Sequence, residues 1–165
     1  ELVVKITVGI LTISYRCSKG LRRDESGPAL SRLVESQGWQ VMQSAVEPDE
    51  REKIRETLLD WSDGKGLALI LTTGGTGLGP RDVTPEATRG VLEKELPGLT
   101  EWMRLEGSKK SEHALLSRAL AGARGRSLII NLPGSPRGAA DSLQAVLNHV
   151  PHALAMLQGE GHGEE

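Results

Sequence analysis

Aromatic side chains are scarce in this chain of 165 residues, which has three tryptophans, one tyrosine and no phenylalanine. Proteins that bind single-stranded nucleic acid usually stack its bases on aromatic side chains, and few are available here. The formal net charge of −2 also means that no overall positive field attracts a polyanion. We therefore expect no nucleic-acid partner.

Cysteine is nearly absent as well. The single cysteine, Cys17, excludes a disulfide within the chain and a cysteine-rich zinc site. It has no obvious base partner in the sequence, and the four histidines have no matching acidic cluster, so we predict neither a thiol nucleophile nor bound zinc. A lone cysteine is typical of proteins in the reducing cytoplasm.

Long hydrophobic runs are missing too, because Lys5 and Gly9 interrupt the best candidate for a membrane span. The first residues lack the ordered regions of a signal peptide, so we expect a cytoplasmic protein without membrane contact. The length and the 25% of charged residues fit one globular domain. We assign that domain to residues 1–157 and predict a flexible polar tail over 158–165.

Short apolar segments alternate with helical patterns along the chain. Strands are expected over 3–13, 39–46, 67–73 and 127–132, with a shorter one near 119–123. Helices are expected over 28–38, from 49 to about 64, over 85–96, around 99–103, and over 138–157 with a kink or split at Pro151. The alternation predicts a three-layer α/β/α fold, with a mostly parallel sheet covered by helices on both faces.

Three polar loops follow predicted strands, over residues 14–27, 73–84 and 131–137. In open α/β sheets, ligands bind beyond the carboxyl ends of the strands. We therefore expect the three loops to converge and to form one binding site.

The loop after residue 73 has four glycines within six residues, in the sequence GGTGLG. It lacks the Gly-Lys-Ser/Thr ending of the NTPase phosphate loop, because Pro80 and Arg81 follow Gly79. The dinucleotide pattern fails as well, since its third glycine would fall on Pro80. Glycine backbones can still approach an anion closely, and the neighbouring threonines add hydroxyl donors. A plain strand-to-helix connection remains the alternative.

Asp82 and Asp49 each have two interpretations. Asp82 stands just before the expected helix, where its charge would favour the helix N-terminus, or it could hold Mg²⁺ beside a bound phosphate. Asp49 and Glu52 have the spacing of a capping box, in which Asp49 would begin a helix. Asp49 also follows a predicted strand, close to the same sheet edge as Asp82. The pattern alone does not decide between these roles.

The other two loops carry further polar groups. The first ends in DESGP, where Asp24 and Ser26 precede a helix whose free N–H groups would favour a phosphate. Four cations stand upstream of it: Arg16, Lys19, Arg22 and Arg23. The last loop, NLPGSPRG, offers Asn131 and the amides of Gly134 and Ser135. A solvated basic loop with a capping serine, and a simple proline turn, remain the alternatives.

Together these motifs resemble one known family. TTGGTG at 72–77, RDVTPEAT at 81–88, DESGP at 24–28, LSR at 116–118, AGARG at 121–125 and LIINLPGSP at 128–136 are its motifs, in its order and spacing. The sequence is similar to the molybdopterin adenylyltransferases, which include the MogA and MoaB proteins and the G domains of gephyrin. The resemblance covers nearly the whole chain.

The resemblance implies a homotrimer with an α/β/α fold and a nucleotidyltransferase activity. In this family the terminal phosphate of molybdopterin attacks the α-phosphate of Mg-ATP, which gives adenylyl-molybdopterin and pyrophosphate. ATP would thus be the co-substrate and Mg²⁺ the metal. A molybdenum-insertion protein would receive the product.

By position, the resemblance assigns the catalytic and metal-holding carboxylates to Asp49 and Asp82. It assigns substrate binding to Ser14, Asp24, Ser26, Gly27, Thr73, Gly74, Gly75, Thr76, Gly77, Arg81, Asn131, Pro133, Gly134, Ser135 and Pro136. One departure is visible, because many members have Ser-Asp where this chain has Ser14 followed by Tyr15. This keeps two alternatives open: a molybdopterin carrier without transferase activity, and a trimeric structural domain with vestigial loops.

Overall fold

The computed structural model describes residues 5–159, and its centre is a six-stranded sheet in the order β2-β1-β3-β6-β5-β4. The strands are β1 (Thr7–Ile13), β2 (Gln40–Glu47), β3 (Leu69–Thr73), β4 (Lys94–Glu95), β5 (Ala121–Arg124) and β6 (Ser127–Leu132). Strands β2, β1, β3 and β6 are parallel to one another, whereas β5 is antiparallel to both of its neighbours, β6 and β4. A mostly parallel sheet is thereby confirmed.

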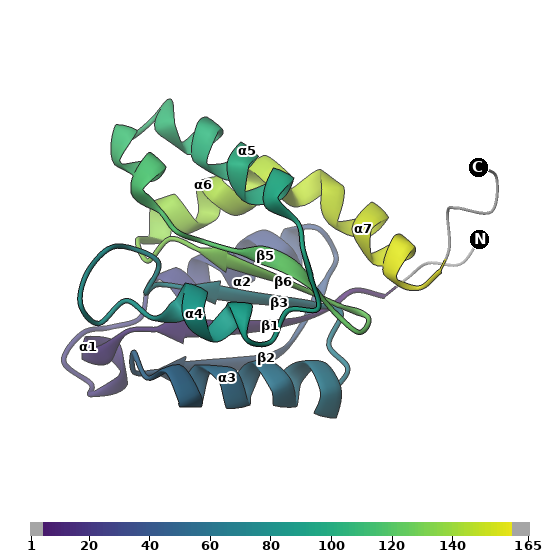
Figure 1. Cartoon of the computed structure of the whole chain (residues 1–165), viewed down its shortest axis with the longest axis horizontal. Helices are drawn as coiled ribbons and strands as arrows, with labels where there is room; N and C mark the ends of the chain where they lie inside the picture. The colour runs from purple at the N-terminus through teal and green to yellow at the C-terminus, as the bar shows by residue number, and fades with distance from the viewer. Residues whose placement is uncertain (1–4, 160–165) are drawn as a thin grey trace.

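Helices cover both faces of this sheet (Figure 1). They are α1 (Tyr15–Ser18), α2 (Ser26–Ser36), α3 (Arg51–Leu59), α4 (Thr84–Arg89), α5 (Pro97–Ser108), α6 (Pro136–Val146) and α7 (Val150–Leu157). Short helical turns are η1 (Asp60–Gly64), η2 (Glu112–Leu116) and η3 (Leu147–His149). Within residues 5–159, no helix combines the length and the apolar character that crossing a bilayer requires.

Alternating side chains of the strands build two cores. Ile10 and Leu71 pack with α2, α5, α6 and α7 on one face, whereas Leu11 and Ile70 pack with α3 and α4 on the other. This alternation follows from the period of two in a β-strand, and fully apolar strands such as β3 are buried on both faces. The predicted three-layer fold is therefore confirmed.

Several predicted boundaries are wrong. The helix expected over 85–96 ends at Arg89, and β4 follows it, with Lys94 paired to Ala123 of β5. A single turn of helix, α1, lies inside the expected loop after Ile13. The split of the last helix is confirmed, because η3 separates α6 from α7. The tail predicted over 158–165 lies outside the described residues from residue 160 onward, and the single domain over 1–157 stays a prediction.

A single asparagine, Asn131, joins the polar groups in the middle of the fold. Its side chain is fully buried, and its amide donates to the hydroxyl oxygens of Thr72 at 2.9 Å and Thr88 at 3.0 Å. Its carbonyl oxygen accepts from the Leu120 N–H at 3.0 Å. The side chain thus connects β3, α4 and the segment before β5 from the end of β6.

We predict that Asn131→Ala lowers the free energy of unfolding by about 2–4 kcal/mol, because it leaves several buried polar groups without a partner. Urea denaturation followed by circular dichroism measures the loss. The matched control is Asn148→Ala, since Asn148 is exposed and should change stability by less than about 0.5 kcal/mol. An equal effect of the two substitutions would contradict the role given to Asn131.

Candidate functional site

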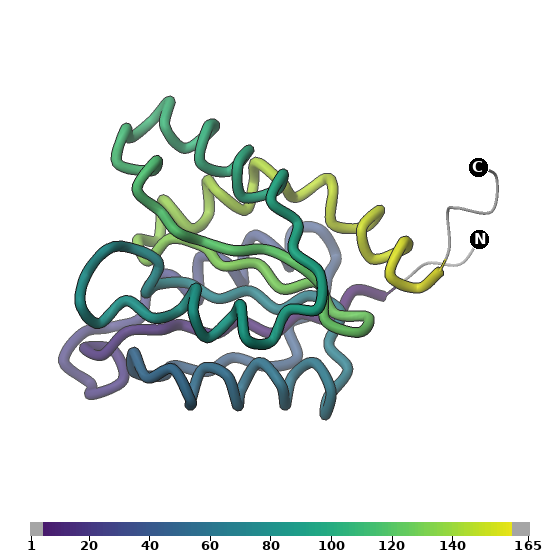
Figure 2. The backbone as a smooth tube through the Cα atoms, viewed as in Figure 1, coloured from purple at the N-terminus to yellow at the C-terminus, as the bar shows by residue number. Residues whose placement is uncertain are grey.

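The strand register brings the three predicted loops to one edge of the sheet. Ile13 of β1 is level with Glu47 of β2, and Thr12 is level with Thr73 of β3. Thr73 is in turn level with Leu132 of β6. The chain therefore leaves four parallel strands side by side, and the loops after β1, β3 and β6 gather at the left end in Figure 2.

A cavity of about 440 Å³ lies where these loops meet, and both predicted carboxylates line it. Its lining includes Asp49, Asp82, Arg81, Gly74, Gly75 and Ser135. Two further cations, Arg16 and Arg22, reach the same cavity from the loop after β1. Acidic and basic side chains from three separate loops, those after β1, β2 and β3, thus face one small volume.

The Asp49 side chain lines this cavity and does not cap a helix. The helix α3 begins at Arg51 with Glu50 at its N-cap, and no side chain caps it, so the predicted capping box is wrong. Instead, the Tyr15 N–H donates to Asp49 Oδ2 at 3.0 Å, from 34 positions away in the chain. Burial raises the pKa of the Asp49 carboxyl, and the charge of Asp82 raises it too. The hydrogen bond from Tyr15 and the charge of Arg81 lower it, but the net result is a raised pKa.

Asp82 is enclosed by its own loop. The Gly79 N–H donates to Asp82 Oδ2 at 2.8 Å. The N-cap residue of α4 is Val83, and no side chain caps this helix. The second half of the glycine loop therefore folds around a carboxylate of the protein itself. The four glycines do not form one anion nest, because Gly74 and Gly75 line this cavity whereas Gly79 binds Asp82.

Arg118 holds this loop from outside, and sequence reasoning did not place it among the candidate residues. Its guanidinium donates to the carbonyl of Gly77 at 2.8 Å and to that of Asp82 at 3.1 Å. It also forms a salt bridge with Glu86 at 2.6 Å. The rigid fork of an arginine suits such multiple contacts, and the LSR motif at 116–118 was the available signal.

The first two glycines of the loop cannot be replaced by a residue that carries a side chain. Gly74 and Gly75 have φ angles of 104° and 69°, in the region that other residues rarely adopt. A Cβ atom on Gly74 would collide with the Ile13 carbonyl oxygen, and one on Gly75 with the Thr84 hydroxyl. Close packing of three segments, together with the backbone turn, explains these glycines.

The turn over residues 133–136 is fixed by two of the predicted binding residues. Ser26 donates its hydroxyl to the Gly134 carbonyl at 2.6 Å, and Thr73 donates to the Pro133 carbonyl at 2.6 Å. Ser135 caps α6 by accepting from the Gly138 N–H at 3.0 Å. These hydroxyls therefore connect loops in addition to lining cavities.

The loop after β1 is held in a similar way. Asp24 accepts from the Thr12 hydroxyl at 2.9 Å and from the Gly27 N–H at 3.1 Å, which fixes the start of α2. Ser14 caps α1 by accepting from the Cys17 N–H at 3.2 Å. Asp24 borders a minor cavity of about 40 Å³ whose lining also includes Ser26, Thr73, Gly134 and Pro136.

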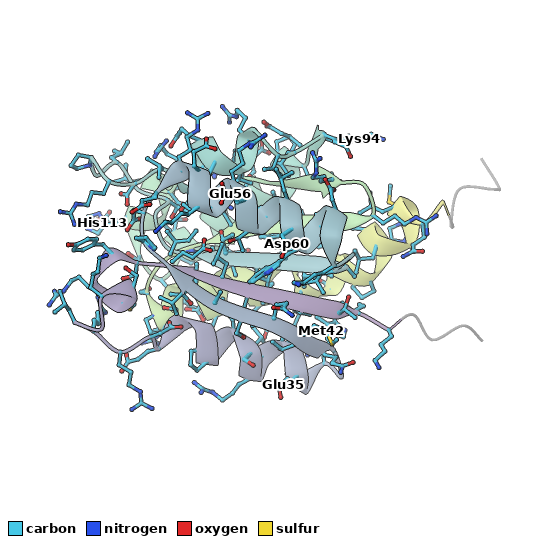
Figure 3. The ribbon with its side chains drawn as sticks, turned by 90° about the horizontal axis from the view of Figure 1, so that it is seen from below. Glu35, Met42, Glu56, Asp60, Lys94 and His113 are labelled. Carbon is cyan, nitrogen blue, oxygen red and sulfur yellow. The ribbon has the colours of Figure 1, made fainter. Side chains whose placement is uncertain are left out.

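A second, larger cavity of about 830 Å³ adjoins the first one. It is bordered by Thr76 and Gly77 of the glycine loop, by Pro133 of the turn and by His113 of η2. Ser135 lines both cavities, so they meet at this residue. Figure 3 shows His113 at the same end of the molecule as α1. Asn131 does not line either cavity and supports them from the core.

The acidic pair fits a magnesium ion better than zinc. Within residues 5–159 there is no cluster of three or more histidine, cysteine or acidic side chains that could hold a metal alone. Mg²⁺ prefers oxygen ligands, keeps several waters, and is usually held by one or two carboxylates together with substrate phosphates. Asp49 and Asp82 supply such a pair in a cavity with room for phosphates.

Comparison with known proteins gives the relationship. A family model described as "Probable molybdopterin binding domain" matches residues 9–152. The chain is 46% identical over 154 residues to the molybdenum cofactor synthesis protein cinnamon of Drosophila melanogaster, covering 92% of this chain and 26% of that longer protein. It is 40% identical over 156 residues to the molybdopterin adenylyltransferase of Helicobacter pylori strain J99, covering 93% of this chain and 89% of that enzyme.

Solved structures agree with this relationship. The crystal structure of the molybdopterin biosynthesis enzyme MoaB from Thermus thermophilus superimposes with a TM-score of 0.89 at 50% identity, over 94% of this chain and 98% of that one. The two proteins are thus similar in both sequence and fold over nearly the full length of each chain. The chain belongs to the molybdopterin-binding domain family of molybdenum cofactor biosynthesis.

Proposed function

We propose that this protein is a molybdopterin adenylyltransferase, which transfers the adenylyl group of Mg-ATP to the terminal phosphate of molybdopterin. A phosphate oxygen of molybdopterin forms a bond to the α-phosphorus of ATP, and the bond to the β-phosphate breaks to release pyrophosphate. The placement of Asp49 and Asp82 on one cavity, beside a second and larger one, carries this proposal. The name of the Helicobacter pylori relative supports it.

The two cavities suit a reaction between two phosphate-bearing substrates. We place the triphosphate of ATP in the cavity with the acids, where Arg16, Arg22 and Arg81 offset its charge. The larger cavity would take molybdopterin, with its phosphate directed to Ser135, where the two cavities meet. Such an arrangement brings attacking oxygen and phosphorus together, and alignment supplies much of the rate of phosphoryl-type transfer.

The chain's own residues then act mainly through charge and position. Asp49 and Asp82 would hold Mg²⁺, which when bound neutralises phosphate charge during transfer. Arg81 faces the same phosphates as a cation, and the backbone of Gly74, Gly75 and Gly134 lines their path. No covalent intermediate with the protein is needed, and no nucleophilic side chain is assigned.

The assembly and its setting also stay proposals. Exposed apolar side chains gather on α5 and η2, where Trp102, Leu105 and Leu115 are each between 46% and 56% exposed. They support a contact surface, since exposed apolar patches mark such surfaces, while the number of three subunits comes from the family resemblance. A molybdenum-insertion protein as recipient of the product, and a cytoplasmic location, remain predictions from the family resemblance.

We predict that Asp82→Asn lowers kcat by about 100-fold or more, because the substitution removes a charge that would hold Mg²⁺ beside the phosphates. Pyrophosphate release from purified molybdopterin and Mg-ATP measures turnover, and pterin fluorescence measures molybdopterin binding. Binding should persist in the variant. The control is Asp60→Asn, an exposed acid of η1 outside both cavities.

Wild-type turnover by the Asp82→Asn variant would remove Asp82 from catalysis. Molybdopterin binding without pyrophosphate release by the unaltered protein, at any Mg²⁺ concentration, would instead identify a carrier. Absence of binding to both molybdopterin and ATP at millimolar concentration would favour a structural domain.

We predict that the Asp49 carboxyl titrates above the ordinary value near 3.8, because burial and the Asp82 charge both favour its protonated form. As the pH falls through this raised pKa, Asp49 loses the charge needed to hold Mg²⁺. Removing the neighbouring charge in Asp82→Asn should lower the pKa of Asp49. Carboxyl carbon NMR titration checks this without substrate, and an unchanged Asp49 pKa in the variant would show that the two acids do not interact.

We predict that the protein in solution has about three times the monomer mass of 17.7 kDa. Light scattering after size exclusion measures this over a range of protein concentrations. A mass that stays at the monomer value at high concentration would contradict the homotrimer.

A further inference from the structure

We propose that Tyr15 is a positioning residue that holds Arg81 at the rim of the acidic cavity while its own backbone holds Asp49. This inference deepens the proposed function and rests on it, because Arg81 is taken to face the phosphates of Mg-ATP. It assigns a role to the position at which this chain departs from the Ser-Asp pattern of its resemblance.

The backbone at Tyr15 is anchored on two sides. Ser14 donates its N–H to the Glu47 carbonyl at 2.9 Å, at the end of the neighbouring strand β2. The next N–H, that of Tyr15, donates to Asp49 Oδ2 at 3.0 Å. The hydroxyl of Ser18 donates to the Tyr15 carbonyl at 2.7 Å, within the single turn of α1. The point from which the Tyr15 side chain projects is therefore well defined.

The ring of Tyr15 meets the guanidinium of Arg81. The Arg81 Cζ atom lies 4.5 Å from the ring centroid, and Lys19 Nζ lies 5.8 Å from it. Both distances are within the range of a cation–π contact, and the shorter one belongs to the residue beside Asp82. Tyr15 and Arg81 line the cavity together with Asp49 and Asp82.

Arg81 has no other partner to hold it among the described residues. None of the salt bridges within residues 5–159 includes Arg81, and its side chain is exposed. A long, unpartnered arginine samples many rotamers, and ordering it costs conformational entropy when a ligand binds. The ring of Tyr15 restricts these rotamers before the ligand arrives.

The chemical nature of the partner matters as much as its position. A carboxylate would orient Arg81 by pairing with it and would cancel its charge. A neutral ring orients the guanidinium from its face and leaves the charge and the N–H donors available to phosphate oxygens. The ring also adds no third negative charge beside Asp49 and Asp82.

A double-mutant cycle tests this role. In the Arg81-containing protein, Tyr15→Leu should lower kcat/KM for Mg-ATP by about 3- to 10-fold, mainly through a higher KM. In an Arg81→Met background the same substitution should have almost no effect, because the contact is already absent. Tyr15→Phe and Tyr15→Trp keep the aromatic face and should keep wild-type values. Lys19→Ala is the control for the more distant cation.

A second readout needs no substrate and separates this inference from the proposed function. The ring of Tyr15 is inferred to restrict the rotamers of the Arg81 side chain before a ligand binds. Tyr15→Leu should therefore increase the motion of the Arg81 guanidinium, and Tyr15→Phe should leave it unchanged. Nitrogen NMR relaxation of the Arg81 Nε–H group measures this motion, even in a protein without transferase activity.

Three outcomes would overturn the role given to Tyr15, and a fourth would separate that role from the proposed function. An equal kinetic effect of Tyr15→Leu with and without Arg81, or an Arg81 side chain whose motion is unchanged by Tyr15→Leu, would overturn the inference and leave Tyr15 a structural residue. A loss of activity in Tyr15→Phe would overturn it as well, since the phenol hydroxyl would then be the important group. Increased Arg81 motion in Tyr15→Leu, with no pyrophosphate release by the wild type, would support the positioning role and reject the proposed function.

Discussion

Parallel pairing of four strands in a fixed register is the constraint on which the rest of the site depends. Because Ile13 is level with Glu47, and Thr73 with Leu132, the loops after β1, β2, β3 and β6 start from one edge. A slip by one residue would turn each side chain of a strand to the opposite face. The buried residues on both faces of β3 oppose such a slip, so core packing also determines where the loops that line the cavities begin.

Much of this frame is visible in the sequence. The apolar runs predicted β3 and β6 because strands covered on both faces have no polar alternation, and Pro151 predicted the break before α7. The helix expected over 85–96 failed for a related reason. Its second half forms β4, which pairs antiparallel with β5, and such pairing depends on a distant segment rather than on local propensity.

The site was predictable as a set of loops and less so as a set of contacts. Asp49 and Glu52 have the spacing of a capping box, but the structure places Asp49 in the cavity lining, with a hydrogen bond from Tyr15. The glycine pattern suggested amides for an anion, yet the amide of Gly79 binds Asp82. Both outcomes depend on partners that sequence spacing does not reveal, since the chain must fold before they meet.

The distribution of charge shows why these contacts matter for the proposed chemistry. A cavity with two carboxylates repels a triphosphate unless a metal ion and separate cations are both available. Direct pairing of Arg81 with either acid would cancel the two charges against each other and weaken both tasks. The observed contacts keep them apart, because backbone amides hold Asp49 and Asp82 while an aromatic ring holds Arg81. Acids remain free for a metal and the cation for phosphate, as phosphoryl-type transfer requires.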